Sequence, residues 1–346
     1  MIERSPTLKD IARELGISAS TVSRALQDHP AISQETIEKV KLVATSIDYF
    51  PDVIARSLRT RGSKSIGVIV PAIKHDFFSS AIDGMEDLAS KNGFVIIVSK
   101  SNEDYNREVL ITQSMISNRV AAIIASVSQS TQDGDHFKRL ISRGIPVVLF
   151  DRVLDDLNVN KVVIDDFHSA YKVVRHLVHS GYRRIAHIAG PRYLKIARER
   201  LRGYREALLD ANIEIVEDYI LHGGLEEKDG ELGVRTLFKL DQPPEAIFAI
   251  NDPVAVGAYG EIIAMGLNIP EDVGITGFSN NPITEIIQPP MTTVDQHGYQ
   301  LGQMAMQLLL EELKHGIGKR SPETKIIDTD LIIRESSMPR FRKINH

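Results

Sequence analysis

Polar side chains at helical spacing near the start of the chain have the chemistry to read DNA bases. Ser20, Ser23, Arg24 and Gln27 follow the spacing i, i+3, i+4 and i+7, so on a helix they project from one side. The opposite side carries the apolar residues Val22, Ala25 and Leu26. A helix with a buried back and a hydrogen-bonding front suits the DNA major groove. An ordinary helical hairpin with a solvated face produces the same pattern and stays open as the alternative.

Two short helices joined by a tight turn would position this polar face. Thr7 is suited to cap the first helix, with the Asp10 carboxylate three residues later in a capping box. Gly16 ends that helix, because glycine takes the left-handed C′ conformation without strain. Ser18 caps the second helix. A third helix, capped by Ser33, follows and is enough to close a three-helix domain; its apolar residues are Ile37, Val40, Ala44 and Ile47.

A second group of polar side chains comes directly after apolar runs in the middle of the chain. Asp151, Asn251 and Asp252 each follow such an apolar run. Arg198 and Arg200 lie near the start of a predicted helix that follows a further apolar run. In open α/β sheets small molecules bind at the carboxyl ends of the strands. We interpret Asp252 as the N-cap of the next helix. For Arg198 a surface ion pair is the alternative to a binding role.

The apolar runs alternate with helical patterns from residue 65 onward, which predicts parallel sheets covered by helices. Two successive series imply two doubly wound α/β lobes behind the all-α head. The predicted strands cover residues 65–71, 94–98, 121–125, 145–150, 162–165, 184–190, 246–250 and 273–278, and residues 77–92 form a helix ended by Gly93.

Composition excludes several classes of function. The chain has no cysteine, which rules out disulfides and thiolate chemistry. Because it contains no His-x-x-x-His, Gly-x-x-x-x-Gly-Lys-Ser/Thr or Gly-x-Ser-x-Gly run, we expect no catalytic residues, no metal and no cofactor. The polar start and the lack of long apolar runs predict a soluble, cytoplasmic protein. The first 64 residues carry a net charge of +2 and the remainder −7, which suits a DNA-facing head on an acidic body.

Motifs along nearly the whole chain resemble the lactose-repressor (LacI/GalR) family of bacterial transcription regulators. The run Ile17-Ser18-x-x-Thr21-Val22-Ser23-Arg24 is followed by Tyr49-x-Pro51-x-x-x-Ala55-Arg56-x-Leu58. Later blocks that resemble the family include Ala197-Arg198-Glu199-Arg200-Leu201-x-Gly203-Tyr204 and Asn251-Asp252-x-x-Ala255-x-Gly257-Ala258.

The resemblance implies a domain plan and a function. We expect a helix-turn-helix head over residues 1–50, a hinge helix and linker over 51–64, and a periplasmic-binding-protein-like body over 65–338. The first lobe would take about 65–162 and 292–323, and the second about 163–291 and 324–338. The implied function is that of a repressor that binds a palindromic operator. A small-molecule effector of carbohydrate type would control its affinity for that operator. A sugar-binding solute-binding protein without DNA function is the alternative.

The resemblance also implies site residues. Leu58 matches the leucine that wedges into the minor groove, with Ala55 on the same face. The expected DNA-binding residues are Thr7, Ala19, Ser20, Thr21, Ser23, Arg24, Ala55, Arg56 and Leu58. The expected effector-binding residues are Phe77, Phe78, Asp151, Arg200, Asn251, Ser279 and Gln296.

Two departures from the family pattern bear on ligand and assembly. Ser279 stands where the family often has a carboxylate, so acidic and phosphorylated sugars are to be tested as ligands beside neutral ones. The tail over residues 337–346 is too short and basic for the leucine-heptad tail that makes some members tetramers. We therefore expect a homodimer.

Overall fold

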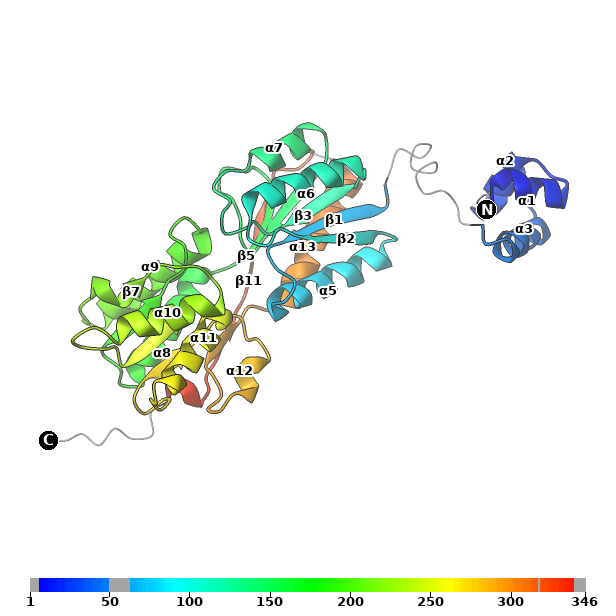
Figure 1. The fold of residues 1–346 in the computed structure, drawn as a ribbon. Coiled ribbons are helices and arrows are strands. Elements are labelled where there is room, and N and C mark those ends of the chain that lie inside the picture. The colour runs from blue at the N-terminus through cyan, green and yellow to red at the C-terminus, as the bar shows by residue number, and fades with distance from the viewer. Residues whose placement is uncertain (1–5, 50–62, 317, 339–346) are drawn as a thin grey trace. The chain divides into compact units, whose positions relative to one another are not determined.

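The computed structural model contains two units, a head over Met1–Ser63 and a body over Lys64–His346 (Figure 1). It describes residues 6–49, 63–316 and 318–338. The expected hinge helix, with Ala55, Arg56 and Leu58, lies outside the described residues.

The head consists of three helices around a small apolar core. They are α1 (Leu8–Leu15), α2 (Ala19–Ala25) and α3 (Gln34–Ser46). Ile11, Val22 and Val40 are fully buried, one from each helix. Each apolar stripe therefore faces the other two helices, as the sequence pattern predicts.

The first lobe of the body is built on a parallel six-stranded sheet. Its strand order is β11 (Thr324–Ile327), β5 (Asn160–Ile164), β4 (Val147–Phe150), β3 (Ala122–Ala125), β1 (Ser65–Val70) and β2 (Val95–Lys100). Successive side chains of β1 point to opposite faces. Val68 accordingly lies in the core under one helical layer, and Ile69 lies in the core under the other.

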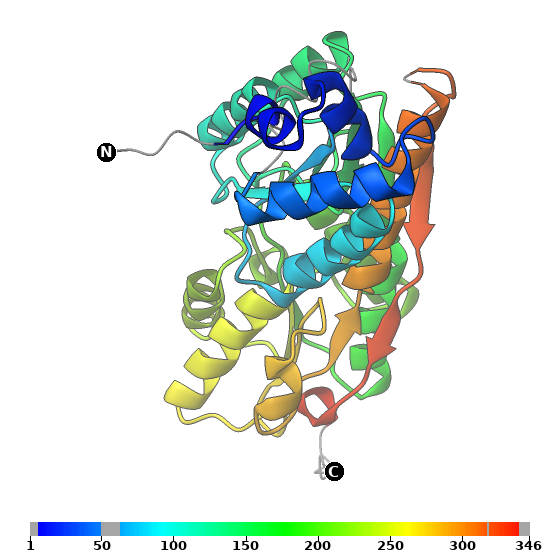
Figure 2. The same ribbon diagram turned by 90° about the vertical axis from the view of Figure 1, so that its right-hand side faces the viewer.

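Helices cover both faces of this sheet. On one face α5 (Asp76–Lys91) and α13 (Gly298–His315) pack side by side (Figures 1 and 2). On the other face lie α6 (Tyr105–Ser117) and α7 (Asp135–Ser142). The sheet is therefore buried on both sides, which explains why its strands read as continuous apolar runs.

The second lobe repeats this plan around a four-stranded parallel sheet. The strand order is β7 (Ile220–Leu221), β6 (Ile185–Ile188), β8 (Ala246–Ala249) and β9 (Gly274–Thr276). Two pairs of packed helices cover it, α8 (Asp166–His179) with α9 (Lys195–Asp210), and α10 (Glu227–Leu237) with α11 (Asp252–Ala264). Short elements complete the lobe: η1 (Glu217–Tyr219), α12 (Ile283–Ile286) and η2 (Glu335–Ser337).

The chain passes between the two sheets after β5, again between β10 and α13, and a third time after β11. Strands β10 (Thr293–Asp295) and β12 (Asp330–Ile332) pair antiparallel where two of these passages run alongside one another (Figure 2). Because β11 pairs with β5, residues 324–327 belong with the first sheet. The sequence-based boundary assigned them to the second lobe.

Candidate functional site

The helix-turn-helix geometry of the head is set by capping residues that the sequence predicts. Asp10 Oδ2 accepts hydrogen bonds from the Thr7 backbone N–H (2.9 Å) and the Thr7 hydroxyl (2.6 Å). Gly16 ends α1 with φ of 64°. Ser18 Oγ accepts from the Thr21 N–H at 3.1 Å and so caps α2. These bonds satisfy one backbone N–H group at each of the two helix starts.

The predicted DNA-facing residues of α2 differ in their exposure. Ser20 and Arg24 are exposed, and Ala19 and Thr21 are half-buried. Ser23 is buried, with only 9% exposed, so the prediction that it projects from the polar side was wrong. The residue lies at the border of the apolar stripe, and α2 packs closely enough on its neighbours to cover it. Figure 1 shows α2 at the surface of the head.

The predicted effector residues come together in one pocket between the two lobes. The space between the pocket walls, counted together with the solvent at its open mouth, is about 520 Å³. All seven residues named from the sequence line it: Phe77, Phe78, Asp151, Arg200, Asn251, Ser279 and Gln296. Phe77, Asp151 and Asn251 follow the carboxyl ends of strands in the two lobe sheets, as the general rule for α/β sheets predicts, and Gln296 follows β10.

On the first lobe, the pocket wall is formed by the start of α5 and by the residues that follow β4. Phe77 and Phe78 meet edge to face, with ring centroids 5.2 Å apart. Asp151 takes a left-handed backbone conformation, with φ of 57°, which aspartate tolerates better than most residues. Burial raises the pKa of the Asp151 carboxyl, against the opposing charges of Arg152 and Arg200.

Arg200 projects from α9 into the wall of the pocket and is itself paired. Its Nε and Nη2 lie 2.8 Å and 2.7 Å from Asp166 Oδ1, and Nη1 donates to the Ile250 carbonyl at 2.5 Å. The guanidinium also stacks on the Phe278 ring at 3.6 Å. The side chain is 2% exposed. Arg200 therefore joins α8, α9 and the end of β8 as well as lining the pocket.

Asn251, and not Asp252, is the N-cap of α11. Asn251 Oδ1 accepts from the Val254 N–H at 2.9 Å. The buried Asp252 carboxylate accepts from the Thr293 hydroxyl and the Asn281 N–H, both at 2.7 Å. The prediction that Asp252 caps the helix was wrong, because its side chain turns toward these residues of other segments.

Arg198 lies outside the pocket. It is 51% exposed, and its Nη2 lies 4.0 Å from Asp155 Oδ2, so the reading as a surface ion pair is confirmed.

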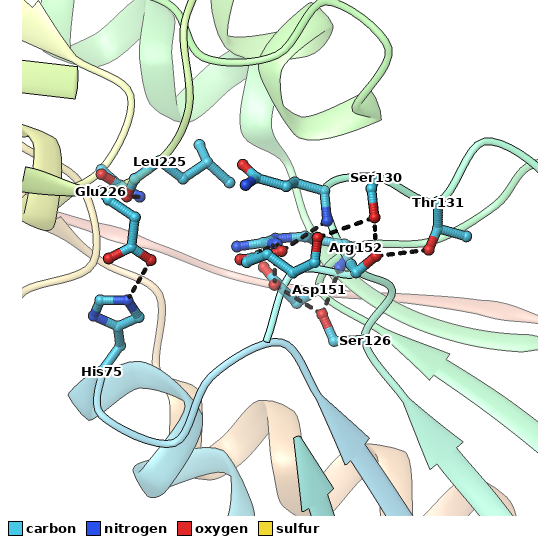
Figure 3. A network of polar contacts seen from close by, with 12 residues as sticks. His75, Ser126, Ser130, Thr131, Asp151, Arg152, Leu225 and Glu226 are labelled. Atoms are coloured by element: carbon cyan, nitrogen blue, oxygen red, sulfur yellow. Dashed lines mark hydrogen bonds and ion pairs between the residues drawn. The ribbon is translucent and has the colours of Figure 1, made fainter. Parts of the chain in front are cut away.

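The pocket also contains charged residues that were not singled out in the sequence. Arg152 Nη1 donates to both oxygens of Glu103 at 2.9 Å. Figure 3 shows Asp151 and Arg152 beside Ser126 on the first lobe. Arg152 and Glu103 could have been predicted from the sequence, because Arg152 directly follows Asp151 and Glu103 comes shortly after β2.

Glu226 reaches the same pocket from the second lobe. It immediately precedes α10, and its carboxylate lies 3.6 Å from His75 Nε2 of the first lobe (Figure 3). It also forms an ion pair with Lys74. Burial lowers the pKa of His75 and favours its neutral form. No sequence pattern links residues so far apart in the chain.

The described residues contain no group of three or more His, Cys, Asp or Glu side chains placed to hold a metal ion. Within the same part of the chain, no helix combines the length and apolar character needed to cross a membrane.

Comparison with known proteins identifies relatives over the whole chain. Residues 7–52 match the bacterial regulatory proteins of the lacI family, and residues 174–337 match the periplasmic binding protein-like domain. The HTH-type transcriptional repressor CytR of Escherichia coli (strain K12) is 32% identical over 97% of this chain and 97% of its own length. The ribose operon repressor of Haemophilus influenzae is 31% identical over 95% of this chain and 98% of its own.

Solved structures agree with this assignment. The transcriptional regulator CelR in complex with cellobiose is 26% identical and superposes with a TM-score of 0.74, covering 96% of this chain and 99% of that one. The lac repressor dimer bound to operator and the anti-inducer ONPF shares the fold, with a TM-score of 0.84 at 24% identity over 97% of this chain and 100% of that one. The chain belongs to the lacI family of bacterial regulatory proteins.

Proposed function

We propose that the chain is a homodimeric transcriptional repressor of the cytoplasm, without catalytic activity. Its head binds a palindromic operator, and a small molecule bound between the lobes changes operator affinity. The main observation in support of this proposal is that one chain contains both of the following features. A capped helix-turn-helix exposes Ser20 and Arg24, and a pocket between two lobes collects the seven predicted effector residues.

The proposed DNA contacts follow from the exposed face of α2. Ser20 and Arg24 would contact base edges, with Ala19 and Thr21 closer to the backbone or to thymine methyl groups. Thr7, Ala55, Arg56 and Leu58 stay assigned to the DNA-facing group from the family resemblance. Ser23 is withdrawn from that group because it is buried. A dimer presents two such heads to the two halves of a palindrome.

The proposed effector is a carbohydrate or a chemically related hydroxyl-bearing compound. Among the relatives, one is a ribose operon repressor and another was solved with cellobiose. A ligand that contacts both Asp151 and Asn251 would hold the two lobes together, and such closure can change the spacing of paired heads.

Selection of bound sequences from a random DNA library tests the proposal directly. The full chain should enrich a two-fold symmetric site, and a chain beginning at residue 64 should enrich nothing. Light scattering of the full chain should give a dimer mass. If the full chain bound small sugars but retained no DNA sequence, the rival reading as a solute-binding protein would stand instead.

A further inference from the structure

We propose that the first lobe has a second ligand site, which binds an organic amine with an apolar body. The site is a cavity at the amino ends of β4, β5 and β11, and the Glu312 carboxylate is the group that receives the ammonium. The pocket between the lobes follows the carboxyl end of β4, so it lies at the opposite end of the same sheet. The inference goes beyond the proposed function, because it uses none of the residues that line that pocket.

The cavity has a size that suits a small organic molecule. Its volume is about 510 Å³, which lies within the range of roughly 300–1,000 Å³ that is usual for ligand sites. Its walls are the end of α7, the C-terminal half of α13, the residues directly before β4 and β5, and the chain that leads into β11. Helix α13 packs against all three strands. The cavity is therefore built largely from packed elements of the lobe.

Much of the lining is apolar and can hold a ring or a hydrocarbon chain. Four apolar residues of the lining are buried: Pro146, Val147, Val159 and Leu308. Ile145 is half-buried, and Ile141 is exposed at the rim. An apolar ligand body placed here covers side chains that water contacts in the empty cavity, and removing apolar surface from water favours binding.

Glu312 gives the cavity a carboxylate without a cation. It is half-buried on α13, and no ion pair is formed with it by any residue that the structure describes. Its hydrogen-bond donor is the Asn160 amide, with Nδ2 3.0 Å from Oε2. Burial raises the pKa of the Glu312 carboxyl, and the hydrogen bond from Asn160 offsets this in part. An ammonium group beside Glu312 would supply both the missing charge and further N–H donors.

The other charged side chains of the lining have partners or face water. Arg320 Nη1 lies 3.5 Å from Glu311 Oε2, and Glu323 pairs with a lysine of β11 at 2.7 Å. Lys319 is exposed, so water screens its charge. Glu312 is therefore the least compensated charge of the cavity, and it selects a cation over an anion.

Matched ligand sets on the full chain test this selectivity. One set is phenethylamine, phenethyl alcohol and phenylacetate, and the other is tryptamine, tryptophol and indoleacetate. The members of a set share a ring and differ in the charge of one group. Calorimetry at constant pH and ionic strength should find at least one amine that binds. The alcohol and the carboxylate of the same set should bind at least about tenfold more weakly.

Methyl NMR spectra of the full chain locate the bound amine. This step is needed because the pocket between the lobes also has carboxylates in its lining. Binding in the cavity should shift the methyl signals of Ile145, Val159 and Leu308. The methyl signals of Ile196 and Leu225, which line the pocket between the lobes, should stay in place.

Two variants assign the binding to the carboxylate and to the cavity. Glu312→Gln should weaken the amine by about tenfold or more, to near the affinity of its alcohol. Glu86→Gln removes the same charge from an exposed site on α5 that lines neither the cavity nor the pocket, and it should change nothing. Ile145→Trp fills part of the cavity without a change of charge, and it should weaken the amine as well. Ile145→Trp decides the site if Glu312→Gln does not fold.

Four results would overturn the inference. They are binding by neither amine, an alcohol that binds as tightly as its amine, methyl shifts at Ile196 and Leu225 in place of the cavity, and an affinity that is unchanged in both Glu312→Gln and Ile145→Trp. Operator binding, followed by mobility shift, reports on the proposed function alone. Its loss would leave the second site to be judged on the ligand data.

Discussion

At the scale of single residues, His187 shows how the core of the second lobe constrains a titratable group. The imidazole is fully buried between Phe248, 4.5 Å away and nearly parallel, and Tyr204 at 5.3 Å. Its Nδ1–H donates to the Phe248 carbonyl at 2.9 Å, and Nε2 has no partner among the described residues. Burial lowers the pKa of His187 to about 3. The ring therefore stays neutral in the folded protein.

This lowered pKa predicts a pH dependence of stability. The unfolded chain binds a proton at His187 near pH 6.5, and the folded chain does not until about pH 3. The neutral His187 therefore leaves the free energy of unfolding at its full value above pH 6.5. As the pH falls below 6.5, protonation of the unfolded chain lowers that free energy by up to ~1.4 kcal/mol per pH unit. The free energy of unfolding, measured with urea between pH 7.5 and 4.5, should fall less steeply with pH for His187→Gln than for the unchanged chain. The exposed His168→Gln should follow the unchanged chain; equal slopes in all three would contradict the prediction.

Arg24 carries a second prediction at this scale, on DNA specificity. Its side chain is exposed on α2, and an arginine bidentate to guanine discriminates by about 1–3 kcal/mol. Arg24→Ala should therefore weaken binding and also broaden the set of sequences that the chain selects. Competition binding over single-base variants of the selected site measures both effects. A uniform loss over all sequences would instead make Arg24 a phosphate contact.

At the scale of elements, glycines set how closely helices pack. A Cβ built on Gly257 of α11 would lie 1.8 Å from the Glu227 carbonyl oxygen at the start of α10. One turn away on the same helix, Gly260 has nothing within 4 Å of that position. The close approach at Gly257 matters for the pocket because Glu226 immediately precedes α10.

The two glycines therefore predict opposite effects of the same substitution. Gly257→Ala should destabilise the chain by about 1–3 kcal/mol or more, since the helices must separate. Gly260→Ala should be neutral or stabilise by up to ~1 kcal/mol, because alanine is the better helix former. Chemical denaturation measures both. Similar values for the two variants would show that α10 can shift without cost.

At the scale of the whole body, two ion-pair clusters join the lobes. Lys74 of the first lobe pairs with Glu226 of the second. Asp155 of the first lobe pairs with Lys195 at 2.5 Å, and Arg198 is close by. Exposed pairs of this kind are worth about 0–1 kcal/mol each and weaken in salt. They can bias the lobes toward closure without locking them.

Charge reversal tests this bias without any ligand. Because the chain has no cysteine, spin labels on Ser117→Cys and Lys239→Cys report the distance between the lobes. Lys74→Glu should lengthen or broaden that distance, and adding Glu226→Lys should restore it. Lys172→Glu, an exposed reversal on α8, is the control and should change nothing. A distance insensitive to all of these changes and to salt would show that the clusters do not influence closure.

The sequence patterns alone determined the local elements, and the resemblance to a known family added most of the residues that meet at the pocket. Caps at Ser18 and Gly16, together with apolar periodicity, placed the head helices, and each apolar run became a strand within a residue or two. Asp151 and Asn251 were predicted because parallel strands end at the same edge. These features depend on neighbours within a few residues or on the general geometry of α/β sheets, so the linear pattern contains them. The short strands β7, β10, β11 and β12 were not predicted. Their own residues show no clear strand pattern, and they form because a neighbouring strand pairs with them.

Only the tertiary structure decided which polar groups remain available. Arg200 was expected to bind the effector, but the packing of α8 against α9 places Asp166, 34 residues earlier in the chain, against its guanidinium. Lys74 meets Glu226 across 152 residues, and Ser23 is buried by neighbouring helices. Burial and ion pairing between distant segments depend on how whole helices pack. No local pattern contains that information, and it determines the charge of the pocket.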